Sequence, residues 1–145
     1  MIVSQILKSK AVEGVLTLGS DASVSEAAAI MSDRRIGTIV VSDDGGATAA
    51  GILSERDIVR NLGQQGAGCL AEAVGRMMTT KLVTCGMGDT SDSILGKMTE
   101  GRFRHMPVVE DGKLVGLISI GDVVKARLAE LAMERDALEG MVMGH

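Results

Sequence analysis

Short apolar segments alternate with polar, turn-forming segments along this chain, and the alternation runs through the same order twice. In the first half, the apolar run Val15–Leu18 has the length of a strand, and Ser23 and Glu26 form the capping-box pattern that begins a helix. Two further apolar runs, "TIVV" and "AAGIL", stand on either side of "DDGG", which is typical of a tight turn. A second helix is expected after Ser54. The first half therefore predicts the order strand, helix, strand, strand, helix.

The second half repeats this order. Leu82–Cys85 takes the place of the first strand, and "MPVV" and "LVGLI", separated by "EDGK", take the place of the hairpin. Val15 aligns with Leu82, and after the hairpin, which is longer in the first copy, Gly51 aligns with Gly116. Internal similarity of this kind indicates two copies of one structural unit.

One copy alone is too small to cover both faces of a three-stranded sheet. Two copies packed sheet to sheet bury those faces, and the repeat relates them by a pseudo-twofold axis. We therefore predict an α/β (α+β) fold of two β-α-β-β-α units. Unit one is placed at residues 3–62, a linker at 63–75, unit two at 76–135, and a C-terminal helix extension and tail at 136–145.

The last predicted helix extends past the repeat and carries an apolar stripe. The stripe is interrupted by Arg135 and consists of Val124, Leu128, Leu131, Leu138 and Val142. It can pack against the body of the same chain or against a second copy. We expect the second arrangement, a homodimer contact.

Composition and charge narrow the functional classes. The net charge is −4, the pI is about 5.1 and Phe103 is the only aromatic residue, so we expect no nucleic-acid binding. No apolar run approaches the roughly 20 residues of a membrane span, and the first residues lack an apolar block of signal-peptide length. We therefore expect a cytoplasmic protein that has no membrane contact.

Residues that could carry catalysis or bind a metal are few. Cys69 and Cys85 form no CxxC pair, so reduced thiols are expected, with Cys85 facing the interior from its strand. The two histidines, His105 and His145, are far apart in the sequence, which argues against a metal site. Because His105 has no identifiable nucleophile partner, we expect neither enzyme activity nor a catalytic cofactor.

One phrase recurs almost unchanged, as "GILSERDIV" from Gly51 and "GLISIGDVV" from Gly116. The Ser-x-x-Asp within it is a helix N-cap pattern, and the glycine could allow close packing, so the phrase needs no ligand. The same geometry also suits a nucleotide. The helix N-terminus and the serine favour phosphate, an aspartate can accept from a ribose diol, and Arg56 and Arg60 stand nearby.

These two phrases and "RHMPVVEDGKLVGLIS" resemble the CBS-domain pair, also called a Bateman module, over nearly the whole chain. The resemblance implies two CBS units packed by their sheets, with modules that often pair again into a disc-shaped dimer. Members of that family mainly sense adenosine compounds: AMP, ADP, ATP, S-adenosylmethionine and sometimes NAD(H). They usually regulate another domain or protein.

The resemblance also implies the ligand contacts. In the family, adenine lies between apolar side chains of the strands, the Asp of the phrase holds the ribose hydroxyls, and the Ser and nearby basic residues bind phosphate. The candidate ligand residues are Thr17, Ile36, Gly37, Thr38, Ser54, Arg56, Asp57 and Arg60 from copy one, and Thr84, Arg104, His105, Met106, Pro107, Ser119 and Asp122 from copy two. Further basic residues that are either solvated or in contact with ligand are Lys10, Arg34, Arg35 and Arg102.

The two copies differ in charge. Arg104 and His105 stand where copy one has Gly37 and Thr38, so the two sites can differ in affinity or ligand. The first functional hypothesis is a regulatory sensor of AMP, ATP or NAD(H) that signals through its homodimer to a separate, unidentified protein. The alternative is a dimeric interaction scaffold that binds no ligand and uses the repeated phrases only as helix caps.

Overall fold

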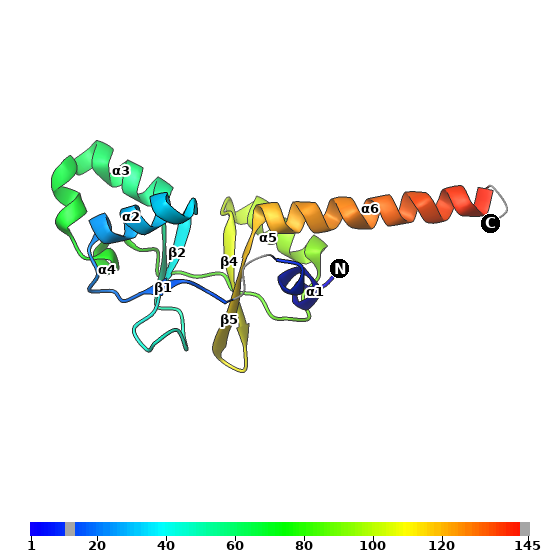
Figure 1. Cartoon of the computed structure of the whole chain (residues 1–145), viewed down its shortest axis with the longest axis horizontal. Coiled ribbons are helices and arrows are strands. Elements are labelled where there is room, and N and C mark those ends of the chain that lie inside the picture. The colour runs from blue at the N-terminus through cyan, green and yellow to red at the C-terminus, as the bar shows by residue number, and fades with distance from the viewer. Residues whose placement is uncertain (11–13, 143–145) are drawn as a thin grey trace.

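The computed structural model describes residues 1–10 and 14–142, and it has two units side by side with one long helix projecting from the second (Figure 1). Residues 143–145, which include His145 and the end of the predicted tail, lie outside the described residues. Unit one contains β1 (Thr17–Leu18), α2 (Val24–Arg34), β2 (Thr38–Val41), β3 (Gly51–Ser54) and α3 (Glu55–Gln65). Unit two contains α5 (Ser91–Gly101), β4 (His105–Glu110), β5 (Lys113–Ser119) and α6 (Ile120–Val142). Outside the repeat are α1 (Val3–Lys8), the 3₁₀ helix η1 (Ala67–Ala71) and α4 (Val74–Met77).

Strand β2 is the centre of a three-stranded sheet in unit one, in the order β1-β2-β3. It pairs in parallel with β1, where Thr17 lies opposite Val40, and antiparallel with β3. All four residues of β2 are buried, which explains the unbroken apolar run in the sequence. Helix α2 begins as predicted, because the backbone N–H of Glu26 donates to Ser23 Oγ over 3.0 Å.

Unit two has an antiparallel sheet of only two strands, β4 and β5. The strand predicted at Leu82–Cys85 is wrong except at its last residue. Cys85 forms a single parallel bridge with Val108, while Val83 and Thr84 are exposed. Because these two side chains bury little apolar surface, the segment is not held along β4.

Each unit takes one short helix from the opposite half of the sequence. Helix α1 precedes unit one, yet Val3 and Ile6 lie in the core of unit two. Helix α4 precedes unit two, yet Val74 and Met77 lie in the core of unit one. We call this arrangement the reciprocal helix exchange, and it ties the two units together through their hydrophobic cores.

Backbone hydrogen bonds show the pseudo-twofold relation between the units. The N–H of Val3 donates to Asp89 O over 2.9 Å, and the N–H of Val74 donates to Ala22 O over 2.7 Å. Ala22 and Asp89 occupy equivalent positions of the repeat. The two exchanged helices therefore dock in the same way, each at the start of the first helix of the other unit.

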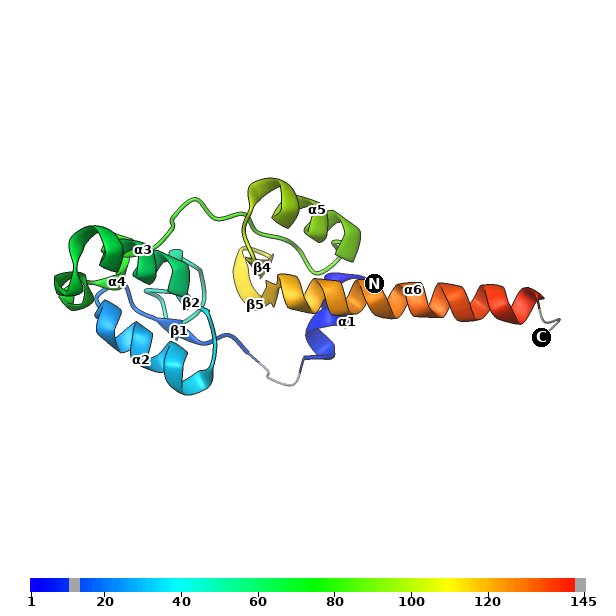
Figure 2. The same ribbon diagram turned by 90° about the horizontal axis from the view of Figure 1, so that it is seen from above.

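The two sheets meet at the middle of the molecule, where β2 and β4 lie side by side, and α2, α3 and α4 lie on the side of unit one away from unit two (Figures 1 and 2). Thr38 at the start of β2 contacts His105 at the start of β4, with 3.0 Å between Oγ1 and Nδ1. These residues are equivalent positions of the two copies. The predicted α/β fold of two repeats packed by their sheets is confirmed.

The second half of α6 extends away from the body of the molecule (Figure 1). Leu128 and Leu138 are each 62% exposed and Val142 is 86% exposed. This exposure excludes the arrangement in which the apolar stripe packs against its own chain. Within residues 1–10 and 14–142, no helix combines the length and the apolar character that crossing a bilayer requires.

Candidate functional site

The repeated phrase forms the same hydrogen-bonded cap in both units. The N–H of Asp57 donates to Ser54 Oγ over 3.2 Å, and the N–H of Ser54 donates to Asp57 Oδ2 over 3.0 Å. Ser119 and Asp122 make the equivalent pair of bonds, at 3.1 and 2.9 Å. Both phrases therefore act as capping boxes at the starts of α3 and α6.

Each cap carboxylate also pairs with a cation of the same chain. Arg60 donates from Nη2 to Asp57 Oδ1 over 2.7 Å, one turn along α3. Lys10 Nζ lies 2.9 Å from Asp122 Oδ2 and donates to the carbonyl oxygen of Leu117, also over 2.9 Å. The carboxylates are thus held in place, and Arg60 and Lys10 sit where they can contact a bound anion as well.

The charge of Asp122 follows from these contacts. Burial raises the pKa of its carboxyl group, but hydrogen bonds from the backbone of Ser119 and from Lys10 outweigh burial and lower that pKa below its ordinary value. Asp122 is therefore a carboxylate at neutral pH.

The glycines of the phrase are contact points for the exchanged segments. A Cβ added to Gly51 would lie 2.5 Å from Met78 Sδ and 2.9 Å from the carbonyl oxygen of Thr79. A Cβ added to Gly116 would lie 2.7 Å from Cδ1 of Leu7. The residue after α4 and the last turn of α1 thus pack directly on β3 and β5, which accounts for the repeated glycine.

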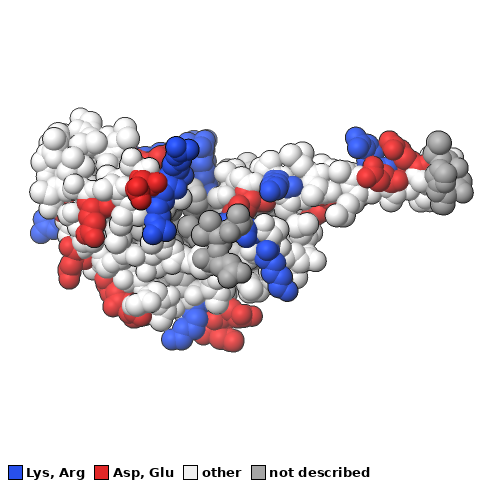
Figure 3. Space-filling model, in the orientation of Figure 1, with Lys and Arg blue, Asp and Glu red and all other residues white. Residues whose placement is uncertain are grey.

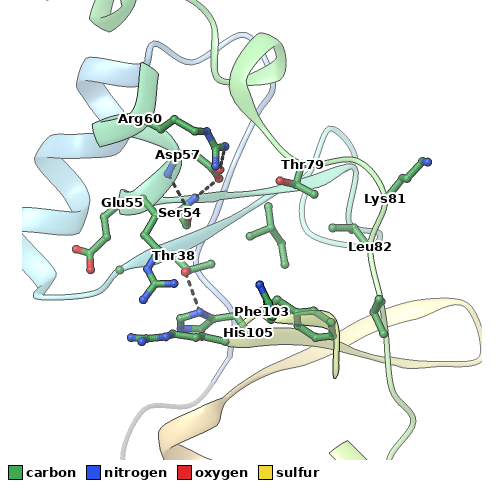
Figure 4. A pocket seen from close by; sticks show the side chains of 17 residues that line it. Thr38, Ser54, Glu55, Asp57, Arg60, Thr79, Lys81, Leu82, Phe103 and His105 are labelled. Atoms are coloured by element: carbon green, nitrogen blue, oxygen red, sulfur yellow. Dashed lines mark hydrogen bonds and ion pairs between the residues drawn. The ribbon is translucent and has the colours of Figure 1, made fainter. Parts of the chain in front are cut away.

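Cleft one, of about 610 Å³, opens beside the start of α3 and faces unit two (Figure 4). Ser54, Asp57 and Arg60 lie on one side of it, and Phe103 and His105 lie opposite (Figure 4). The segment after α4 closes a third side. The lining residues are Gly37, Thr38, Ile52, Ser54, Glu55, Arg56, Asp57, Arg60, Thr79, Lys81, Leu82, Val83, Gly101, Arg102, Phe103, Arg104 and His105.

Cleft two, of about 640 Å³, lies beside the start of α6 in the pseudo-symmetric place. Lys10 lines it, and Asp122 reaches it through the ion pair with Lys10. The lining residues are Ser4, Leu7, Lys8, Lys10, Gly14, Val15, Leu16, Arg35, Ile36, Gly37, Thr38, Met87, His105, Val115, Gly116, Leu117 and Ser119.

Positive charge predominates in both clefts. Cleft one has five lining cations, Arg56, Arg60, Lys81, Arg102 and Arg104, against the carboxylates of Glu55 and Asp57. Cleft two has Lys8, Lys10 and Arg35, and its described lining contains no carboxylate. Lys and Arg side chains gather where the two units meet, whereas the end of α6 carries both signs of charge (Figure 3). On a chain of net charge −4, this concentration of cations marks the clefts as anion sites.

The structure brings most of the predicted site residues together. Those that line cleft one are Gly37, Thr38, Ser54, Arg56, Asp57, Arg60, Arg104 and His105. Those that line cleft two are Ile36, Gly37, Thr38, His105 and Ser119. Of the further basic candidates, Arg102 lines cleft one, while Lys10 and Arg35 line cleft two.

Five predicted residues stand outside both linings, and one of them is Asp122, which reaches cleft two only through its ion pair. Met106 is fully buried in the core of unit two and Pro107 is buried in β4. Thr17 is half-buried at the start of β1, and Thr84 is exposed. A ligand contact at these five positions stays a prediction of the sequence.

Sequence reasoning missed the segments that cross between the units. Thr79, Lys81, Leu82 and Val83 line cleft one, and Gly14–Leu16 lines cleft two. Val15, Leu16, Leu82 and Val83 fall in the first half of the strands expected at Val15–Leu18 and Leu82–Cys85, whereas β1 begins only at Thr17. The two segments align with each other in the repeat, and this alignment was the available signal. A segment that crosses between the units in one copy implies an equivalent crossing segment in the other copy.

Neither of the two cysteines lines a cleft. Cys69 and Cys85 are buried free thiols, one in each core. Burial raises the pKa of the Cys85 thiol to about 11, and the nearby charge of Asp89 adds to the effect. A thiol of that pKa is uncharged at neutral pH and a weak nucleophile.

Comparison with known proteins identifies both copies. The family model described as "CBS domain" matches residues 3–64 and 74–129. A protein named "CBS domain-containing protein CBSX3, mitochondrial", from Arabidopsis thaliana, is 34% identical over 98% of this chain and 72% of its own length. The chain spans only 22–24% of several longer Arabidopsis relatives that also carry CBS domains in their names.

Solved structures show the same fold. The CBS-domain protein ATU1752 from Agrobacterium tumefaciens is 45% identical, with a TM-score of 0.83 over 88% of this chain and 99% of its own. The CBS domain protein PAE2072 from Pyrobaculum aerophilum, solved in complex with AMP, is 28% identical, with a TM-score of 0.78 over 92% of this chain and 99% of its own. An adenosine ligand is thus known in one structural neighbour of this chain.

Proposed function

The chain belongs to the CBS-domain family, and we propose that it is a regulatory sensor that binds an adenosine nucleotide in clefts one and two. The observation that carries the proposal is the same arrangement in both clefts. At cleft one, the capping-box carboxylate of Asp57 lies beside Arg60, and both line the cleft. At cleft two, the capping-box carboxylate of Asp122 pairs with Lys10, and Lys10 lines the cleft. Each pair lies near the N-terminus of a helix, beside a cleft rich in positive charge.

The lining residues suit the three parts of a nucleotide. In cleft one, we propose that Asp57 accepts hydrogen bonds from the ribose hydroxyls. These bonds would replace its hydrogen bond from Arg60, and the Arg60 side chain would then contact the phosphate. Ser54 and the first N–H groups of α3 favour an anion. Ile52, Leu82 and Val83 provide apolar surface for the base. AMP bound to PAE2072 supports an adenosine compound as the ligand class.

The regulated partner is proposed to be a separate protein, and the chain is proposed to act as a homodimer through the exposed stripe of α6. Ligand binding would change how the two units sit against each other, and the dimer would pass that change to the partner. We propose no enzymatic activity. The cytoplasmic location expected from the sequence stays a prediction.

The alternative is a scaffold in which the repeated phrases are only caps. The fully formed capping boxes at Ser54 and Ser119 support this alternative, because they account for Ser and Asp without a ligand. The two hypotheses differ in whether the charge of each aspartate matters for anything besides folding.

Thermal melts and calorimetry with AMP, ADP, ATP, NAD, NADH and S-adenosylmethionine test the proposal. A ligand at about 100 times its Kd adds about 2.7 kcal/mol to the free energy of unfolding, which raises the melting temperature by several degrees. Asp57→Asn and Asp122→Asn keep an oxygen that can accept the cap hydrogen bond but remove the charge. Each is expected to weaken ligand binding in its own cleft.

Asp33→Asn is the matched control, because Asp33 is exposed on α2 and lines neither cleft. It should leave the ligand response unchanged. If none of the six compounds binds the unaltered protein, the sensor hypothesis is wrong and the scaffold is favoured. Binding that survives both cleft substitutions would place the site elsewhere.

A further inference from the structure

The two clefts share one wall, and that wall contains a single titratable group. Gly37, Thr38 and His105 line both clefts. His105 and Thr38 are equivalent residues of the two copies, and they meet across the pseudo-twofold axis at 3.0 Å. A residue beside such an axis faces both symmetry-related sites at once, so one imidazole serves two clefts.

Charged groups of both signs surround the His105 ring. Lys10 and Asp122 face it from the side of cleft two, Glu55 from the start of α3, and Arg104 precedes it in the chain. Burial lowers the pKa of His105 below its ordinary value, Lys10 and Arg104 lower it further, and Asp122 and Glu55 act in the opposite direction. His105 is therefore neutral at pH 7 in the ligand-free protein.

Thr38 can hold this ring in either charge state. When the imidazole is neutral, the Thr38 hydroxyl can donate to an unprotonated Nδ1. When the ring is protonated, Nδ1–H donates to Thr38 Oγ1 instead. The ring therefore keeps its place between the clefts whether or not it carries a proton.

We propose that His105 couples the two clefts: a phosphate bound in either cleft favours the imidazolium form of His105, and that form strengthens binding in the other cleft. The inference rests on the proposed function, because it needs an anionic ligand in each cleft. Thermodynamic linkage fixes the sign of the coupling between the clefts. Two ligands that both bind the protonated protein more tightly bind with positive cooperativity.

The expected coupling is modest. If one ligand raises the pKa of His105 by about one unit, it binds the protonated protein about tenfold more tightly. At a pH about one unit above the ligand-free pKa of His105, binding of the first ligand then increases the affinity for the second ligand about threefold. The coupling disappears at a pH at which the ring is fully protonated even without ligand.

The test measures the His105 ring directly, with AMP as the probe. The sequence contains two histidines, so the imidazole signals are readily assigned by NMR with a His105→Gln variant. The pKa of His105 is measured without and with saturating AMP in two single-cleft proteins, Asp57→Asn and Asp122→Asn, each compared with its own ligand-free state. The phosphate group of AMP itself titrates near pH 6 (about one unit below neutrality). The pH dependence of AMP affinity would therefore mix the titration of the ligand with that of His105, whereas the ring signals report His105 alone.

We expect AMP to raise the pKa of His105 in both single-cleft proteins. We also expect His105→Gln to weaken AMP binding about threefold or more in both of them at pH 6, measured by calorimetry. Arg60→Gln is the control, because Arg60 lines only cleft one and should weaken binding only in the Asp122→Asn protein.

The outcomes separate the two proposals. AMP that binds in both single-cleft proteins and shifts the His105 pKa in only one, or in neither, overturns the coupling and leaves the sensor function intact. No binding of AMP to the unaltered protein contradicts the sensor function for AMP and the coupling with it. A pKa shift in both proteins, with binding weakened by His105→Gln in both, supports the coupling.

Discussion

At the scale of single residues, the capping-box carboxylates of Asp57 and Asp122 each have two partners: the serine of the box and a basic side chain. The basic side chain says more about how the molecule is held together. Lys10 reaches Asp122 from the far end of the sequence, and the ion pair is only partly exposed, at 28% and 22% of the two side chains. The capping bonds are local to the repeated phrase, whereas this ion pair links the segment after α1 to the start of α6.

Lys10→Met is predicted to raise the pKa of Asp122. Burial raises this pKa, and the substitution removes the hydrogen bond and the charge of Lys10 that lower it. A carboxyl group with a lowered folded-state pKa adds stability above its unfolded pKa of about 3.9, and this stability is lost as the pH falls through the folded pKa. The variant should therefore melt about 2 °C lower than the unaltered protein at pH 7. The difference should shrink toward zero as the pH falls through the folded-state pKa of Asp122.

Calorimetric melts from pH 7 to pH 2.5 check this prediction. Lys8→Met is the control, because Lys8 lines the same cleft but forms no ion pair with any residue among 1–10 and 14–142. A pH-independent difference between Lys10→Met and the unaltered protein would mean that the lost contact is with Leu117 rather than with Asp122.

Residue types and spacing predicted the caps, and the resemblance to the CBS-domain pair added much of the candidate anion site. Ser54, Asp57 and Arg60 lie in or beside a repeated phrase, whereas His105 was identified through the resemblance. Lys81 was missed, although it lines cleft one, because its neighbours in the sequence carry no motif. Its place in the cleft depends on where the chain crosses between units, which is a property of tertiary structure.

At the scale of elements, the strands of the phrase differ in how tightly the exchanged segments cover them. Gly51→Ala is predicted to be the more damaging of two matched substitutions, because its new methyl group would approach the backbone oxygen of Thr79. Gly116→Ala would meet only the flexible end of Leu7, which can move aside. The expected losses are about 2 kcal/mol and under about 1 kcal/mol, respectively.

Urea unfolding curves of the two variants check the order of these losses. Gly63→Ala in α3 is a useful third protein, since nothing lies within 4 Å of an added Cβ there and the helix should gain slightly. Equal losses at Gly51 and Gly116 would show that the Thr79 segment moves as easily as a side chain.

Helix α6 makes a prediction about assembly. A chain that ends at Ala132 retains the helix residues buried in the body, Val123 and Ala126, and loses the second half of the exposed stripe. It should keep its melting temperature at low protein concentration and should be monomeric by light scattering, because the proposed dimer contact is gone.

Substitution separates this effect from a general loss of helix. Leu131→Ser with Leu138→Ser should weaken the dimer as truncation does, whereas Glu134→Ser with Arg135→Ser should not. If the unaltered protein is already monomeric, or if both double variants behave alike, the stripe of α6 is not the dimer contact.

The pattern of apolar positions predicted most elements, and its one clear failure is instructive. The apolar run of β4 became a strand because Met106, Pro107 and Val108 are buried, and β5 pairs with it through the buried residues Gly116 and Ile118. Leu82–Cys85 has the same apolar character in the sequence, but only Cys85 is buried. The apolar residues Leu82 and Val83 line cleft one instead of a sheet. A single sequence does not distinguish an apolar run that lines a cleft from one that forms a strand.

At the scale of the whole molecule, the repeat predicted two units and their symmetry, but not the reciprocal helix exchange. The unit boundaries read from the sequence include α1 in unit one and divide α4 between the linker and unit two. In space, α1 and α4 lie in the opposite cores. The two units should therefore unfold together rather than one after the other, because neither core is complete without a segment of the other half.

The reciprocal helix exchange also sets an order of events during synthesis. Helix α1 leaves the ribosome before either sheet, but the core that receives Val3 and Ile6 is complete only when Ala126 has been made. Unit one can close earlier, as soon as Met77 has emerged. Helix α1 thus has no core to pack into while the rest of the two units is being made, and its apolar face is a part of the molecule that chaperones would find exposed.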